Sequence, residues 1–158
     1  ISGEHLPFED RSFDVVVACH VLEHIPRSGR DAFLDSLMIK AKKAVILINP
    51  FQSKESNRQL EFINKEWKTR WAQEHLDCEM PRTEDVLDYA ERRGLSCKMT
   101  PNGNTATTFA LIWLDLVMKR KETRDKWYRV NRFVNTQMMH MMDSDQFPTA
   151  YLTVLERK

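Results

Sequence analysis

Glycine and cysteine are both scarce in this sequence, and long apolar runs are missing. Four glycines among 158 residues leave little room for a glycine-rich loop that cradles phosphate groups. The three cysteines, Cys19, Cys78 and Cys97, are odd in number, widely spaced and without a C-x-x-C pair. This pattern argues against a disulfide framework and favours a reducing, cytoplasmic environment. No run approaches the roughly 18 apolar residues of a transmembrane helix, so we expect no membrane span.

An excess of charge of one sign is also missing. The net charge is +1 at pH 7, so the chain has no overall field that would select an anionic partner. Residues 119–132 carry seven basic and two acidic side chains with two aromatic rings between them, a pattern that suits nucleic acid. Such a segment is more often a solvated helix surface. Because the whole chain is nearly neutral, we expect no nucleic-acid binding.

What the sequence does contain is the pattern of an α/β domain. Residues 13–19 and 44–48 are continuous β-branched and apolar runs, as expected for strands that are covered on both faces. Between them, residues 28–42 place apolar side chains at helical spacing. Strand, helix and strand in this order predict a βαβ unit with a parallel pair of strands.

The rest of the chain is predicted to be mainly helical, and its length suffices for one domain. The predicted elements are a helix at 54–75, a helix with Thr83 as its N-cap and Gly94 as its stop, a strand at 95–100, a turn at 101–104, and helices at 105–120 and 123–142. A last strand is predicted at 150–155. Because its apolar residues alternate with period two, we expect it at or near an exposed part of the sheet.

The stretch from His20 to His24 spells H-x-x-E-H, which is a zinc-peptidase signature. That site needs both histidines on one face of a helix several turns long. Here His20 directly follows a predicted strand, and Pro26 leaves room for one helical turn at most. A third ligand would have to come from elsewhere, and no local signature marks the candidates Glu55, Glu61, Glu66 and Glu74. We therefore expect no metal, and polar residues at the end of a strand, where α/β sheets place their ligands.

Residues 6–26, LPFEDRSFDVVVACHVLEHIP, carry a more specific pattern. They contain L-P-F, then S-F-D-V-V, a short apolar strand, and V-L-E-H-I-P. This order resembles the middle of class I S-adenosylmethionine-dependent methyltransferases of the small-molecule type. The resemblance is specific over residues 1–50 and loose over residues 51–103. From 104 to 147 only helical character is shared.

The resemblance implies an α/β fold with a partial Rossmann-like sheet. The sheet would hold the family's strands four to seven, with an antiparallel last strand and flanking helices. Residues 1–158 would form a single truncated methyltransferase domain, and residues 104–147 a helical insertion before the last strand. The implied activity is methyl transfer from S-adenosyl-L-methionine to an oxygen, nitrogen or carbon of a small molecule, glycan or lipid.

The resemblance also implies roles for residues around the end of the first strand. On the cofactor side we expect Ser2, Gly3, Glu4, Cys19 and His20. On the acceptor side we expect Glu23, Asn49 and Phe51, the last two at the mouth of the pocket. His24 would be a general base for an acceptor hydroxyl, or equally a cap for the turn that follows it.

Two family features are absent from the sequence. These are the glycine-rich loop after the family's first strand and the acidic residue that ends its second strand. We therefore expect the carboxyl-terminal part of a methyltransferase, without most of its cofactor site and inactive alone. The alternative is a cofactor-free interaction module derived from this fold. Without the family's first strand beside it, strand 13–19 becomes an apolar sheet edge, which favours a dimer through this strand.

Overall fold

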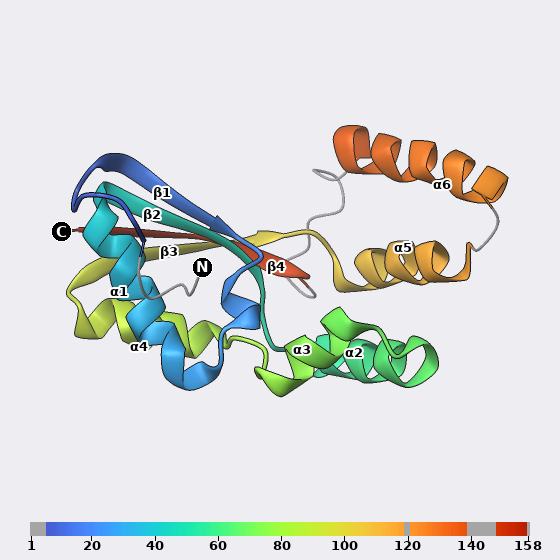
Figure 1. The fold of residues 1–158 in the computed structure, drawn as a ribbon, viewed down its shortest axis with the longest axis horizontal. Coiled ribbons are helices and arrows are strands. Elements are labelled where there is room, and N and C mark those ends of the chain that lie inside the picture. The colour runs from blue at the N-terminus through green and yellow to red at the C-terminus, as the bar shows by residue number, and fades with distance from the viewer. Residues whose placement is uncertain (1–5, 119–120, 139–147, 158) are drawn as a thin grey trace.

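Four strands form one mixed sheet in the computed structural model, which describes residues 6–118, 121–138 and 148–157. The strands are β1 (Phe13–Cys19), β2 (Ala41–Pro50), β3 (Leu95–Asn102) and β4 (Ala150–Arg157). Their order across the sheet is β1-β2-β4-β3. β1 runs parallel to β2, whereas β4 runs antiparallel to both of its neighbours, β2 and β3 (Figure 1). The predicted α/β class and the antiparallel last strand are confirmed.

The crossover between β1 and β2 is made by α1 (Arg30–Lys40), as the βαβ pattern predicts. The apolar residues at helical spacing are at most 5% exposed, namely Phe33, Leu34, Leu37 and Met38. α4 (Thr83–Arg92) lies beside α1 against the same face of the sheet (Figure 1). The two helices are also joined by polar contacts, because Asp35 accepts hydrogen bonds from the Tyr89 hydroxyl at 2.9 Å and from Arg93 at 2.8 and 2.5 Å.

The position of β4 corrects one prediction. We expected this strand at an exposed part of the sheet, but it lies in the interior, hydrogen-bonded along both sides. Thr153 and Leu155 are fully buried. The period-two alternation reflects a sheet that has its helical layer on one face, and it carries no information on whether a strand is central or at the edge.

β1 departs from prediction in the opposite sense. Its continuous apolar run predicted cover on both faces, yet Phe13, Val15 and Val17 are 40–59% exposed. Among the described residues β1 pairs with β2 alone and so forms one edge of the sheet. The predicted apolar edge is therefore present. Pairing of this edge with a second copy stays a prediction.

The long helix predicted at 54–75 is two helices. α2 (Lys54–Trp67) starts with a capping box in which Ser53 and Ser56 bond each other's backbone amides. Lys68 then adopts a left-handed conformation with φ of 50°, and α3 (Arg70–Asp77) follows. α3 packs against α2 in a second apolar cluster that includes Ile63 and Ala72. The apolar period runs through both helices, so it could not mark the break.

Smaller corrections concern element ends. Arg82 is the N-cap residue of α4, and Thr83 is its first helical residue, without a side-chain cap. Gly94 has a φ of 64°, which confirms it as a helix stop. β3 continues through Asn102, so the predicted turn shrinks to the residues around Gly103.

The segment between β3 and β4 is helical where it is described. α5 (Thr105–Val117) is capped by Asn104, whose side chain accepts from two backbone amides. α6 (Lys121–Phe133) continues into one π-helical turn, Val134–Met138. That residues 104–147 are an insertion stays a prediction. Within the described parts of the chain, every helix is too short or too polar to cross a membrane.

Candidate functional site

The candidate site lies where the parallel strands β1 and β2 have their carboxyl ends, at one end of the sheet. His20 follows β1 directly, and its N–H donates to the carbonyl of Ile48 at 2.9 Å. Its φ of 53° lies in the left-handed region, and the chain turns there into a single 3₁₀ turn, η1 (Leu22–His24). The H-x-x-E-H stretch therefore forms no α-helix on which His20 and His24 could share a face.

Glu23 is the centre of a buried hydrogen-bond network. Its side chain is fully buried. One carboxylate oxygen accepts from Nδ1 of His20 at 3.0 Å, and the other accepts from the amide of Asn49. Burial alone would raise the pKa of Glu23, but the hydrogen bonds outweigh it and lower the pKa. The carboxylate is thus held charged and fixed in position from β2 and from the turn after β1.

Two histidines face each other beside this network. His24 comes from η1 and His75 from α3, 51 residues further along the chain, and their Nε2 atoms are 3.4 Å apart. Nδ1 of His24 lies 3.6 Å from a carboxylate oxygen of Glu74, an ion-pair distance rather than a hydrogen bond. Burial and the nearby His24 lower the pKa of His75. Glu23, His24 and His75 each offer one ligand atom, and these atoms lie within 4.8 Å of one another.

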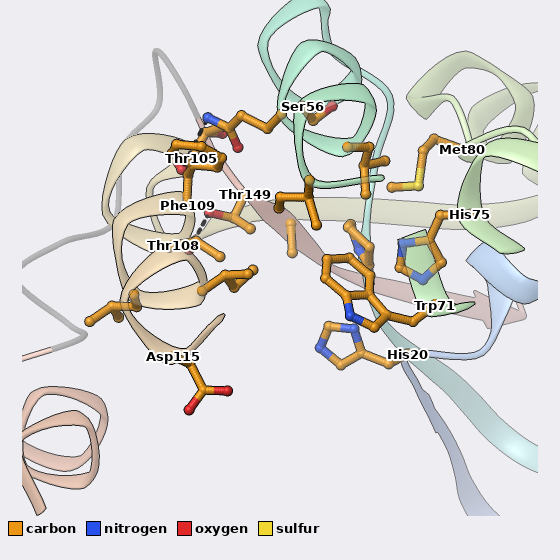
Figure 2. Close-up of a pocket in the computed structure, with 18 of the residues that line it drawn as sticks. His20, Ser56, Trp71, His75, Met80, Thr105, Thr108, Phe109, Asp115 and Thr149 are labelled. Atoms are coloured by element: carbon orange, nitrogen blue, oxygen red, sulfur yellow. Dashed lines mark hydrogen bonds between the residues drawn. The ribbon is translucent and has the colours of Figure 1, made fainter. Parts of the chain in front are cut away.

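A cavity of about 610 Å³ opens between this edge of the sheet and the helices α2, α3 and α5. Figure 2 shows His20, Trp71 and His75 on one side of it and residues of α5 on the other. The apolar part of the lining includes Leu60, Ile63, Trp71, Met80, Phe109 and Ile112. Ten polar side chains also line the cavity, among them Asp115 and the bonded hydroxyls of Thr108 and Thr149, which are 2.8 Å apart. Volume and lining match those of small-molecule sites, which measure roughly 300–1,000 Å³.

The structure brings most of the predicted site residues to this edge. Cys19 is exposed at the end of β1, and His20 lines the cavity. Glu23 and Asn49 are buried and bonded to each other. Phe51 belongs to the hydrophobic core, where its ring packs edge-on against Tyr151 with centroids 5.6 Å apart. Their roles toward cofactor and acceptor stay predictions.

Three predicted residues, Ser2, Gly3 and Glu4, lie outside the described residues.

Two residues that line the cavity, Trp71 and His75 of α3, were not predicted as site residues. No role was expected for His75. Trp71 stands four residues after Trp67, the spacing of an ordinary packing face. The signal that was available is the helical i, i+4 pairing of Trp71 with His75, whose rings are in edge contact at 5.6 Å.

Comparisons with known proteins point to one fold. Residues 1–43 match the model of a family described as "Methyltransferase domain". The solved structure of magnesium protoporphyrin IX methyltransferase from Synechocystis PCC 6803 with bound SAH aligns with a TM-score of 0.53 at 13% identity, over 100% of this chain and 49% of that one. The YcgJ protein of Bacillus subtilis aligns with a TM-score of 0.53 at 10% identity, over 99% and 68%. The chain carries part of the class I methyltransferase fold.

Within this methyltransferase fold, β1, β2, β3 and β4 take the places expected of strands four, five, six and seven. The chain spans about half the length of the protoporphyrin methyltransferase, 49%. The [4+2]-cyclase SpnF has the same fold, with a TM-score of 0.50 at 12% identity over 99% of this chain and 54% of that one. The fold thus hosts more than one reaction and does not by itself assign one. No curated protein sequence matches the chain.

Proposed function

We propose that this chain is part of an S-adenosylmethionine-dependent methyltransferase that acts on a small molecule or lipid with a largely apolar body. The observation that carries the proposal is the cavity at the carboxyl end of the parallel strands β1 and β2. Open α/β sheets bind their ligands at this end. The family match over residues 1–43 includes β1 and the η1 turn, so family and cavity meet at the same edge.

The described residues fit the rim of an S-adenosylmethionine site and no more. Cys19 and His20 would flank the methionine portion, as the resemblance implies. A glycine-rich loop is absent from the 158 residues, and we infer that most cofactor contacts come from sequence outside them. The bound cofactor supplies an activated methyl group. The protein then contributes chiefly position and exclusion of water.

The lining of the cavity favours one kind of acceptor. Apolar and polar side chains line it in equal number, but most of its accessible lining surface is apolar, so an apolar body would be desolvated at little cost. A glycan carries hydroxyls on every side, and many of these would be buried without a partner against Trp71, Phe109 and Ile112. A small molecule or lipid with few polar groups therefore fits better than a glycan.

The general-base role predicted for His24 finds no support in the geometry. Among the described residues the cavity is lined by His20 and His75 rather than His24. The Nε2 atom of His24 faces His75 at 3.4 Å. A base must lie within hydrogen-bond reach of the proton that it removes. His24 is not among the lining residues of the cavity, so its role as a base stays a prediction.

The test uses the full product of the gene. S-adenosylhomocysteine is titrated into it by calorimetry, and transfer of labelled methyl groups into an organic extract of cells is followed. We expect one binding site for S-adenosylhomocysteine and a labelled apolar product. Trp71→Ala should raise KM for the acceptor without changing S-adenosylhomocysteine affinity. Trp113→Ala, at an exposed tryptophan outside the cavity lining, should change neither.

Failure of the full product to bind S-adenosylhomocysteine would refute the proposal. The cofactor-free interaction module would then become the leading function. Equal effects of Trp71→Ala and Trp113→Ala on KM would show that the cavity is not the acceptor site. They would not contradict the methyltransferase activity.

A further inference from the structure

We propose that Glu23, His24 and His75 form a binding site for a zinc-like divalent cation at the wall of the cavity. The three residues offer two imidazole nitrogens and a carboxylate oxygen within 4.8 Å of one another. They come from η1 and α3, which are distant in sequence and adjacent in space. This site differs from the one that the sequence motif suggested, because His75 takes the place of His20.

The spacing of the two histidines fits a shared cation. Two nitrogens at the Zn–N distance of about 2.05 Å, in tetrahedral geometry, stand about 3.3–3.4 Å apart. The two Nε2 atoms of His24 and His75 are 3.4 Å apart. That separation is long for a direct hydrogen bond between the rings. The lone pairs of two neutral imidazoles would repel each other at this distance unless a proton or a cation lies between them.

Glu23 lies close enough to be a third ligand and keeps a free acceptor position. A carboxylate has about four acceptor positions, and bonds from His20, Asn49 and the Glu23 backbone amide occupy three of them. One position is left for a cation. To reach bonding distance, the oxygen has to come within about 3.4 Å of each nitrogen, which requires a small shift from its present separation of at most 4.8 Å.

The surroundings resemble the outer shell of a metal site. A histidine that binds a metal through one nitrogen commonly donates from the other nitrogen to a carboxylate. His24 has Glu74 at 3.6 Å from its Nδ1, on the side away from His75. His20 likewise holds the carboxylate of Glu23 from outside the cluster at 3.0 Å. His20 and Glu74 are thus positioning residues in this proposal, and neither is a ligand.

The donor set limits which cation would bind. Two imidazoles and one carboxylate suit zinc and neighbouring first-row metals. Mg²⁺ prefers oxygen ligands in octahedral geometry and should bind far more weakly. Three protein ligands leave a fourth tetrahedral position open, as in catalytic zinc sites. His75 lines the cavity, so a cation held by His75 would lie at the cavity wall.

The site also bears on the acceptor, and this step rests on the proposed function. A divalent cation lowers the pKa of an oxygen that binds to it. An acceptor hydroxyl held in the open position would release its proton to solvent more readily, and its oxygen would keep the electron pair. The acceptor class is then an apolar molecule with a hydroxyl group, and the product an O-methyl ether.

Metal binding can be measured without turnover. The full gene product is freed of metal with a chelator, and ZnCl₂, CoCl₂ and MgCl₂ are titrated separately by calorimetry, with the visible spectrum recorded for cobalt. We expect one equivalent of zinc per chain, a tetrahedral cobalt spectrum and no saturable magnesium binding. His24→Gln and His75→Gln should each weaken zinc binding more than about tenfold.

The matched control is Asp77→Asn, which removes an exposed carboxylate from α3, two residues after His75. It should leave zinc affinity unchanged. Zinc binding that survives either histidine substitution, or that is absent from the wild type, overturns the site. His75→Gln could lower the melting temperature of the metal-free protein by itself. In that case His24→Gln alone decides the test, because the His24 side chain is 38% exposed and its replacement should not disturb the fold.

The same preparation is titrated with S-adenosylhomocysteine, which separates the two proposals. Zinc binding without S-adenosylhomocysteine binding would keep the cation site and refute the methyltransferase. S-adenosylhomocysteine binding without zinc would refute the cation site alone.

Discussion

Replacing both members of the buried pair Glu23 and Asn49 should destabilise the protein less than replacing Glu23 alone. Glu23→Leu keeps the volume of the side chain but removes the acceptor of the Asn49 amide. Both residues are fully buried, and Oδ1 of Asn49 already has no partner among the described residues. After the substitution, both ends of this amide would be buried without a hydrogen bond. His20 adds little to the cost, because its side chain is 61% exposed and water can replace Glu23.

The expected magnitude follows from that count. An orphaned buried donor costs about 1–3 kcal/mol, which lowers Tm by about 2–12 °C in a domain of this size. Glu23→Leu combined with Asn49→Val removes both partners, and such paired replacements are close to neutral. Valine also suits the strand position in β2. The double variant should therefore recover most of the stability that the single variant loses.

The assay is urea unfolding followed by circular dichroism, with EDTA present so that bound metal does not contribute. Glu74→Gln serves as the control, since this glutamate is 41% exposed and should change stability by less than about 0.5 kcal/mol. A double variant no more stable than Glu23→Leu would refute the reasoning. So would a Glu23→Leu protein as stable as the wild type.

Three further predictions concern other parts of the fold. The hydrogen bond from Arg93 lowers the pKa of Asp35 below 3.8, so the stability from this carboxylate is present above pH 3.8 and lost as pH falls through the lower folded value. Asp35→Asn should therefore destabilise the protein at neutral pH and converge with the wild type in acid, and a gap in urea midpoints that persists in acid contradicts this. Val17 on the β1 edge is 59% exposed, so Val17→Lys should reduce self-association in sedimentation velocity. Val130→Lys on α6 should not, and equal effects would argue against the edge as a dimer interface. Gly94 has a φ of 64°, and a Cβ there would meet nothing within 4 Å. Gly94→Ala should thus lower the free energy of unfolding by about 1 kcal/mol from backbone strain alone, and Gly94→Asn should lower it less. A thermal melt in which the Asn variant is the less stable of the two would contradict the left-handed assignment.

The local pattern predicted the first half of the fold well. The two strand runs and the helix between them were found from apolar spacing, and β1, α1 and β2 follow that pattern. Gly94 marked a helix end because a left-handed residue favours glycine. What failed was long-range: the break at Lys68 and the interior place of β4 depend on which elements pack together, and neither has a local signature.

The positions of the candidate site residues were predicted to the same extent and for the same reason, and their roles stay predictions. Placing candidate residues at the carboxyl end of β1 needed only the βαβ topology, and Glu23 and His24 lie there with Asn49. His75 could not be found, because it reaches His24 only after the left-handed turn at Lys68 redirects the chain into α3. A contact across 51 residues depends on tertiary packing, which no motif within either segment encodes.

The interior place of β4 also determines the order in which the strands can pair while the chain is being synthesised. β3 hydrogen-bonds to β4, and among the described strands it has no other neighbour. β1, α1 and β2 can assemble as soon as they emerge, and α4 can pack against α1, whereas β3 has no strand to pair with until residues 150–157 follow. Until then β2 and β3 both expose the edges that β4 will cover, and another chain could occupy them.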